Sequence, residues 1–136
     1  MNALRQVLYF SRASVALTDS EVRQILWISQ RNNRIADITG CLLFSGRHFA
    51  QVLEGDSRQL DAALLRIGND KRHSEIVLAI DHVVSVRRFP QWSMGVLFKA
   101  DLIDMLETLI TSQSVSDDDA FKILGEMNPD SLMGAL

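Results

Sequence analysis

The chain has 136 residues, 47% of them hydrophobic and 23% charged, with a formal net charge of −3, which fits one globular domain with a two-layer core. Without a basic stripe it does not resemble a nucleic-acid-binding protein, and no apolar stretch approaches the roughly 20 residues of a membrane span. We see no signal peptide. The single cysteine, Cys41, excludes an internal disulfide and fits a reducing cytoplasm, where we expect it to be a core residue.

The N-terminal region predicts a strand followed by an amphipathic helix. Residues 4–10 form an apolar run typical of a central strand, and a loop is expected over 11–17. Thr18 and Glu21 have the spacing of a capping box, which begins a helix. Residues at three- and four-residue steps share one face of this helix, which we expect to lie against the sheet: Val22, Ile25, Ser29, Asn32 and Asn33.

The middle of the chain predicts a hairpin, a second helix and two more strands. The β-rich runs 38–44 and 48–53 are joined by a three-residue turn. A second helix is expected to begin after Asp56, and strands are expected over 75–83 and 92–98. The buried stripe of the second helix comprises Leu60, Ala63, Leu64 and Ile67.

The order of elements, β-α-β-β-α-β-β, indicates an α+β fold with a ferredoxin-like sheet and an extra strand. We expect the first and third strands to be parallel neighbours, which would place Tyr9 beside Gln51, and both helices to cover one sheet face. In the fifth strand, alternation places Trp92, Met94 and Val96 on one face.

After Lys99 the pattern becomes helical. Apolar residues within 102–109 predict one helix, and those within 121–124 predict a shorter one. These helices would pack on the other sheet face or form the interface of a dimer. We therefore divide the chain into a domain over 1–98 and a helical extension over 99–136, which would be a cap, a dimerisation element or an output element. Leu132, Met133 and Leu136 make the tail an accessory cap or a docking segment.

Three uncharged polar side chains lie where the pattern favours apolar ones. Tyr9 and Gln51 interrupt apolar strand runs, and Asn33 falls on the apolar helix face. A buried amide or phenol without a partner costs about 1–3 kcal/mol. The three must therefore satisfy one another or bind a ligand with a hydrogen-bonding edge. No metal-ligand set and no nucleophile–base pair accompanies them, which favours binding a flat, polar-edged molecule over hydrolysis.

Six motifs, in order and at the right spacing, resemble the BLUF domain (blue-light sensing using flavin) over residues 4–98. Singly, each has an ordinary explanation: Tyr9 as a core tyrosine, Asn33 as a helix end. Together they resemble the short, stand-alone bacterial members of the family. The motifs are YFS at 9–11, SQRNN at 29–33, ITG at 38–40, FAQVLEG at 49–55, DKRH at 70–73 and RFPQWSM at 88–94.

The resemblance implies a role for each matching residue. Tyr9 matches the tyrosine that gives an electron and a proton to the excited flavin, and Gln51 matches the glutamine between that tyrosine and the flavin ring, which rearranges in the light. Asn33 matches the asparagine at the ring's polar edge, and Asn32 a neighbouring flavin contact. Trp92 and Met94 match the pair that relays the state of the glutamine to the sheet; which of them lies beside the flavin in the dark stays open.

The resemblance also implies FAD as the noncovalent cofactor, and it is the sole basis for this expectation, because the sequence has no glycine-rich phosphate motif. The apolar end of the flavin ring would be lined by Ile25, Ile28, Phe49 and Ile67. Basic residues near the helix ends would contact its phosphates and ribityl chain, or are solvated surface charges: Arg31, Arg34, Arg66, Lys71, Arg72 and His73. Asp70 is expected to pair with one of them.

We therefore expect a non-enzymatic bacterial blue-light photoreceptor. It would signal through a partner protein or through its oligomeric state, and we expect it to form a homo-oligomer. By family analogy, candidate partners are a cyclic-di-nucleotide phosphodiesterase and a transcription regulator, with neither nucleic acid nor a membrane bound directly. Two alternatives use the same fold. One is an acylphosphatase-like hydrolase with Arg12 in a phosphate loop, and the other is a light-insensitive interaction module. His48 and His82 are assigned no chemistry.

Overall fold

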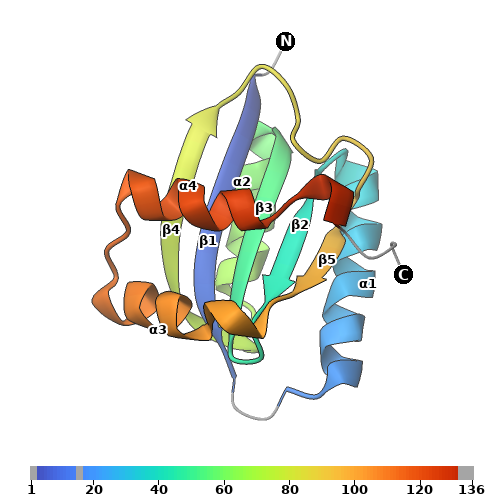
Figure 1. Cartoon of the computed structure of the whole chain (residues 1–136). Helices are drawn as coiled ribbons and strands as arrows, with labels where there is room; N and C mark the ends of the chain where they lie inside the picture. Colours follow the sequence, from blue (N-terminus) through green and yellow to red (C-terminus); the bar gives the residue numbers. More distant parts are fainter. Residues whose placement is uncertain (1–2, 15–16, 132–136) are drawn as a thin grey trace.

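A five-stranded sheet in the order β4-β1-β3-β2-β5 forms the centre of the molecule (Figure 1). The computed structural model describes residues 3–14 and 17–131, so the tail residues Leu132, Met133 and Leu136 lie outside the described part. The elements are β1 (Leu4–Ala13), α1 (Asp19–Ala36), β2 (Thr39–Phe44), β3 (His48–Asp56), α2 (Ser57–Gly68), β4 (His73–Val83), β5 (Gly95–Phe98), α3 (Ile103–Ser112) and α4 (Asp117–Glu126), with 3-10 turns at Ala100–Leu102 and Pro129–Ser131.

Strand directions correct one expectation. β1 pairs with β3 in antiparallel orientation, and not in parallel as predicted. The tight β2–β3 hairpin reverses the chain, so the strand that runs parallel to β1 is β2, and β3 lies between them. The expected adjacency is nevertheless confirmed, because Tyr9 lies directly opposite Gln51 in the β1–β3 register.

Helices cover both faces of the sheet, as predicted. Figure 1 shows α1 and α2 behind the sheet and α3 and α4 in front of it. Phe49 and Leu53 of β3 pack with α1 and α2, whereas Ala50 and Val52 pack with α3 and α4. The C-terminal helices therefore bury the second face of the sheet, which was one of the two predicted alternatives for them.

Several strand boundaries differ from the prediction. β3 continues to Asp56 beyond the predicted end at 53, and β4 begins at His73 and not at 75. β1 continues to Ala13, within the predicted loop, because Arg12 pairs with His48 of β3 and Ser74 of β4. β5 begins only at Gly95 and not at 92. The carbonyl of Trp92 accepts a hydrogen bond from the Gly40 amide at 2.9 Å, in a turn instead of a strand ladder.

The late start of β5 separates three residues that were expected on one face. Met94 and Val96 lie in the core beneath α1 and α2. Trp92 instead packs against the core beneath α3 and α4. Alternation along a strand does not apply to residues 92–94, because this part of the chain is not extended.

A side-chain cap begins α1 but not α2, the two helices that face the candidate site. The predicted capping box is present, with the Thr18 hydroxyl accepting from the Glu21 amide at 3.2 Å. Asp56 is the N-cap of α2, although its side chain makes no capping hydrogen bond.

Among residues 3–14 and 17–131, no helix is long and apolar enough to cross a membrane.

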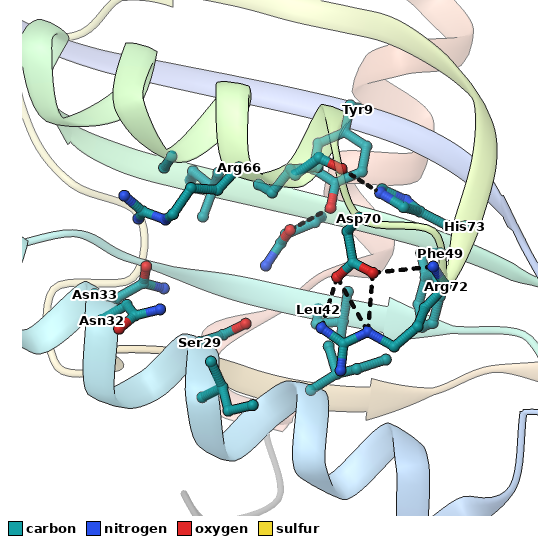
Figure 2. Close-up of a pocket in the computed structure, with 16 residues that line it drawn as sticks. Tyr9, Ser29, Asn32, Asn33, Leu42, Phe49, Arg66, Asp70, Arg72 and His73 are labelled. Atoms are coloured by element: carbon teal, nitrogen blue, oxygen red, sulfur yellow. Dashed lines mark hydrogen bonds and ion pairs between the residues drawn. The ribbon is translucent and has the colours of Figure 1, made fainter.

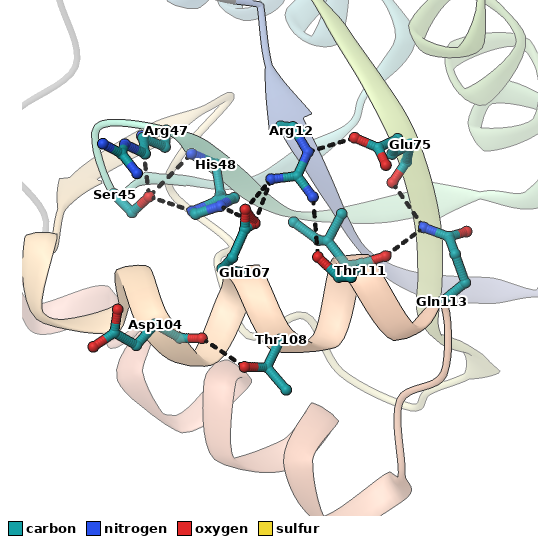
Figure 3. Close-up of polar contacts among 11 residues, drawn as sticks. Arg12, Ser45, Arg47, His48, Glu75, Asp104, Glu107, Thr108, Thr111 and Gln113 are labelled. Carbon is teal, nitrogen blue, oxygen red and sulfur yellow. Dashed lines mark hydrogen bonds and ion pairs between the residues drawn. The ribbon is translucent and has the colours of Figure 1, made fainter.

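A polar cluster joins α3 to the sheet on the face opposite α1 and α2 (Figure 3). The Arg12 guanidinium donates to the carboxylates of Glu75 in β4 and Glu107 in α3. His48 is fully buried, with Nδ1 3.0 Å from the Ser45 hydroxyl and Nε2 3.4 Å from the Glu107 carboxylate. These contacts fix α3 across β1, β3 and β4.

Candidate functional site

A cavity of about 310 Å³ lies between α1 and α2, with the sheet as its floor (Figure 2). This is within the range of roughly 300–1,000 Å³ that is typical of small-molecule sites. Its lining comprises Tyr9, Ile25, Ile28, Ser29, Asn32, Asn33, Leu42, Phe49, Gln51, Leu53, Ala63, Arg66, Ile67, Asp70, Arg72 and His73.

Ten of the candidate cofactor contacts line this cavity: Ile25, Ile28, Asn32, Asn33, Phe49, Arg66, Ile67, Asp70, Arg72 and His73. The structure thus brings them together; their role as ligands of a cofactor stays a prediction. The remaining basic candidates, Arg31, Arg34 and Lys71, are not in the lining. Arg31 and Arg34 border a shallow groove with Trp27 on α1 instead.

Four lining residues were not predicted as ligand contacts. Leu42 and Leu53 face the cavity from β2 and β3, Ala63 faces it from α2, and Ser29 from α1. Periodicity placed Ser29 on the sheet-facing side of the helix and Ala63 in the buried stripe. Helical periodicity predicts that a residue faces the interior, but it does not distinguish a residue that lines a cavity from one that packs in the core.

Tyr9 and Gln51 in the cavity lining form a hydrogen-bonded chain with Met94, which lies outside the lining. The Tyr9 hydroxyl donates to Oε1 of Gln51, and Nε2 of Gln51 donates to Sδ of Met94 at 3.4 Å. All three side chains are buried. Burial, reinforced by the negative charge of Asp70, raises the pKa of Tyr9, so the phenol keeps its proton at neutral pH.

The end of α1 fixes the segment that carries Met94. Asn33 donates from Nδ2 to the Ser93 carbonyl at 2.8 Å, and Gln30 donates from Nε2 to the Met94 carbonyl at 2.9 Å. Gln30 is buried but was not singled out from the sequence. Its three-residue spacing from Asn33 on the same helix was the available signal.

Charged residues lie at the end of the cavity away from Asn32 and Asn33 (Figure 2). Arg72 forms the expected ion pair with Asp70, at 2.6 Å between Nη2 and Oδ2. Hydrogen bonding to Arg72 lowers the pKa of Asp70, so this carboxylate is ionised at neutral pH. His73 lies beside them, with Nδ1 2.7 Å from the Ser11 hydroxyl and Nε2 2.6 Å from the Ile67 carbonyl. Because a carbonyl only accepts, Nε2 carries a proton.

The cavity suits a flat heterocycle with one polar edge. Within the described residues, the side chain of Asn32 and the Oδ1 atom of Asn33 have no hydrogen-bond partner. Both amides point into the space between α1 and α2 in Figure 2, as does the Arg66 guanidinium. Isoleucine and phenylalanine side chains supply apolar walls. The described part of the chain holds no group of three or more histidine, cysteine or acidic residues suited to a metal ion.

Comparison with known proteins agrees with this chemistry. The family model "BLUF: Sensors of blue-light using FAD" matches residues 4–95. The blue light- and temperature-regulated antirepressor BluF of Escherichia coli K12 is 36% identical over 74 residues, which is 54% of this chain and 18% of that protein. The beta subunit of a photoactivated adenylate cyclase from Euglena longa is 28% identical over 94 residues, 68% of this chain and 11% of that protein. The chain thus matches less than a fifth of the length of these relatives.

Solved structures extend the likeness beyond the family motifs. The dark-state structure of the BLUF protein BlrB aligns over 97% of this chain and 99% of its own, with a TM-score of 0.79 and 31% identity. A bacterial light-regulated adenylyl cyclase aligns over 90% of this chain but 36% of its own, with a TM-score of 0.68 and 26% identity. The chain belongs to the BLUF family of blue-light sensors, whose members bind flavin.

Proposed function

We propose that this chain binds FAD noncovalently in the cavity between α1 and α2 and converts blue light into a rearrangement of the Gln51 side chain. The hydrogen-bonded chain from Tyr9 through Gln51 to Met94 is the observation that carries the proposal. It joins an oxidisable phenol to an amide that can change its hydrogen-bond partners, and both border the cavity.

The lining residues fit the parts of FAD. Asn32 and Asn33 would hold the polar edge of the ring with amide donors and acceptors, which add no charge. Apolar side chains would hold the dimethylbenzene end. Arg66 offers positive charge for the ribityl and phosphate groups, and Arg72 would contact them through Nη1, since its pair with Asp70 uses only Nε and Nη2. The apolar set comprises Ile25, Ile28, Phe49 and Ile67.

When bound, flavin supplies absorption of blue light and, in its excited state, an acceptor for one electron and one proton. Tyr9 gives up one electron and its phenolic proton and later recovers both, so the cycle leaves no net oxidation. The phenol reaches this state protonated, since burial raises its pKa. Loss of the phenolic hydrogen leaves Oε1 of Gln51 without its donor.

Gln51 then changes its hydrogen bonds. Rotation or tautomerisation of its amide exchanges donor and acceptor positions at almost constant shape. In the described arrangement the Gln51 amide donates to Met94; rotation removes that hydrogen bond, and tautomerisation leaves the nitrogen only one hydrogen with which to make it. We propose that Met94, together with Trp92 on the other sheet face, relays the change to the helical extension over 99–136, away from the sensory domain over 1–98.

The signal would leave through protein contact or a change in homo-oligomeric state. The relatives named as an antirepressor and as adenylate cyclases support a regulatory partner of the transcription or cyclic-nucleotide class. Which protein receives the signal is a question for pull-down experiments in the dark and under blue light, compared with Tyr9→Phe protein.

A dark–light–dark absorption series tests the proposal. The purified protein, reconstituted with FAD where necessary, should show flavin bands that shift slightly to the red after blue light and recover in the dark. A protein that stays colourless after reconstitution, or that binds FAD but shows no reversible shift, would contradict it.

The hydrolase alternative finds no support at the candidate site. Its phosphate-binding arginine would be Arg12, but the Arg12 side chain contacts Glu75 and Glu107 on the sheet face opposite the cavity. A guanidinium already paired with two carboxylates is a poor phosphate ligand.

A further inference from the structure

The connection between β4 and β5, residues 84–94, touches both faces of the sheet. Phe89 is fully buried beneath α3 and α4, and Trp92 packs against the same core. Met94, two residues later, lies in the core beneath α1 and α2 and contacts Gln51. This connecting segment is therefore one short stretch of chain that contacts the candidate site at one end and the C-terminal helices at the other.

A buried carboxylate fixes the connecting segment to the sheet. Glu54 of β3 has no exposed surface, and its carboxylate accepts hydrogen bonds from the backbone amides of Arg88 and Phe89, both at 2.9 Å. Gln6 of β1 donates to the same carboxylate at 2.8 Å. A buried carboxylate is costly unless it is satisfied, and its three donors tie the segment to β1 and β3.

Arg88 continues this contact to the end of α4. Its guanidinium donates to the carbonyls of Leu124 and Met127, each at 3.3 Å, and lies 5.8 Å from the centre of the Phe89 ring. The Leu124 carbonyl also accepts from the Met127 amide at 3.0 Å, and the negative end of the helix dipole favours a cation at these last carbonyls. Arg88 therefore acts as a C-terminal cap of α4 supplied by the connecting segment.

The part of the segment between Arg88 and Met94 is short and braced. The Trp92 amide donates to the Phe89 carbonyl at 3.3 Å and closes a turn. On the far side of this turn, the carbonyls of Trp92, Ser93 and Met94 accept from Gly40, Asn33 and Gln30. Both ends of the turn are therefore held by hydrogen bonds, the Met94 end by α1 and β2 and the Arg88 end by Glu54.

We propose that Glu54 and Arg88 are positioning residues that couple the Gln51–Met94 contact to the C-terminal end of α4. Glu54 holds the backbone of residues 88 and 89, and the Arg88 side chain, which lies against the Phe89 ring, passes a change in the turn to the carbonyls of Leu124 and Met127. The inference rests on the proposed light-driven change at Gln51 and names the contact through which that change reaches the helical extension.

Hydrogen–deuterium exchange of peptides covering 117–127, measured in the dark and under blue light with absorbance recorded on the same sample, tests the coupling. In the wild-type protein, illumination should change exchange in these peptides. In Arg88→Gln, the absorbance shift should persist, dark exchange at the end of α4 should rise, and the light-minus-dark difference should be lost. Arg88→Lys, which keeps the charge and one donor, should retain part of the difference.

Arg87→Gln is the matched control. Arg87 is adjacent, but its guanidinium donates to Thr39 and to the backbone carbonyls of Glu54 and Asp37, away from α4. This variant should keep the wild-type difference in peptides covering 117–127. A similar loss in Arg87→Gln would assign the effect to general loosening of the segment and overturn the role of Arg88.

The outcomes separate the two proposals. A wild-type protein without a reversible absorbance shift overturns the proposed function and, with it, light-driven coupling. A normal shift with no exchange change in α4 overturns the coupling alone. So does a full light-minus-dark difference in both Arg88→Gln and Arg88→Lys.

Discussion

The Gln51 amide donates from Nε2 to Met94 Sδ at 3.4 Å, while its Oε1 accepts from the Tyr9 hydroxyl. The two ends of one amide thus face two different elements, β1 and the chain leading into β5. Sulfur is a weak acceptor and the phenol a good donor. This arrangement of the Gln51 amide is therefore held mainly by its hydrogen bond with Tyr9.

Tyr9→Phe should keep the fold and the bound flavin but abolish the reversible absorbance shift. Phenylalanine fills the same space, yet it has neither an oxidisable phenol nor a proton for transfer. The fold should lose about 1–3 kcal/mol, because Oε1 of Gln51 is left buried without its donor. Dark and light absorption spectra of the FAD-loaded variant check this. A wild-type shift would remove Tyr9 from the mechanism.

Gln51→Leu separates the switch from the electron donor. Leucine keeps the buried volume but has no amide to change partners, so the red shift should disappear while flavin bands and cooperative unfolding remain. Tyr9 would still be close enough to quench the excited flavin, which a fluorescence lifetime shorter than that of Tyr9→Phe would reveal. If the red shift survives unchanged, Gln51 is not the switch.

Most residues of the candidate site were predictable because local sequence patterns mark them. A phenol and two amides in apolar patterns marked Tyr9, Gln51 and Asn33, and family motifs added the residues on the cavity walls. Gln30 and Glu54 lie inside two of the same motifs, but their polar contacts are not predictable from the sequence pattern. Their partners are backbone groups far along the chain, at Met94 and at Arg88 and Phe89, and no side-chain pattern reveals such bonds.

The errors in the predicted fold have two physical causes. The predicted adjacency of β1 and β3 is confirmed, but their predicted parallel direction is wrong. The β2–β3 hairpin reverses the chain, so β3 runs antiparallel to β1. The β-rich composition of residues 92–98 suggested a strand throughout. Hydrogen bonds from Gly40, Asn33 and Gln30 instead hold the carbonyls of residues 92–94 in a turn, so tertiary contacts override local propensity.

His48 should make the fold sensitive to mild acid. Burial lowers its pKa below the ordinary value of 6.5, although Glu107 partly opposes the shift, and Arg12 and Arg47 add to the lowering. Between the folded pKa and about 6.5 the unfolded chain binds more protons, so the free energy of unfolding should fall as pH drops through this window. Its contribution is fully present above 6.5.

Urea unfolding near pH 7.5 and near pH 5.5 measures this dependence. His48→Gln should be less stable than wild type at the higher pH, because Ser45 and Glu107 lose the imidazole, but should lose less stability on acidification. His82→Gln removes a histidine outside the Glu107 cluster and serves as the control. An acid response in His48→Gln equal to that of wild type would assign the dependence to another group.

Gly40 should tolerate no side chain. A Cβ atom there would lie 1.9 Å from the Val52 carbonyl oxygen, and both residues belong to the β2–β3 ladder, where neither backbone can move alone. The Gly40 amide also holds the Trp92 carbonyl, so a shift of β2 would disturb the connecting segment as well. Gly40→Ala should therefore lower the free energy of unfolding by about 3 kcal/mol or more.

Gly68→Ala provides the opposite expectation for the same chemical change. Gly68 ends α2, and a Cβ atom there meets no other atom within 4 Å. Alanine should raise the free energy of unfolding by about 0.5–1 kcal/mol, because it restricts the unfolded chain and favours the helix. Urea denaturation of both variants, followed by far-UV circular dichroism, measures the contrast. Equal stabilities would mean that β2 and β3 can separate at Gly40, and the close register of the strands that carry the Gln51 site would then be wrong.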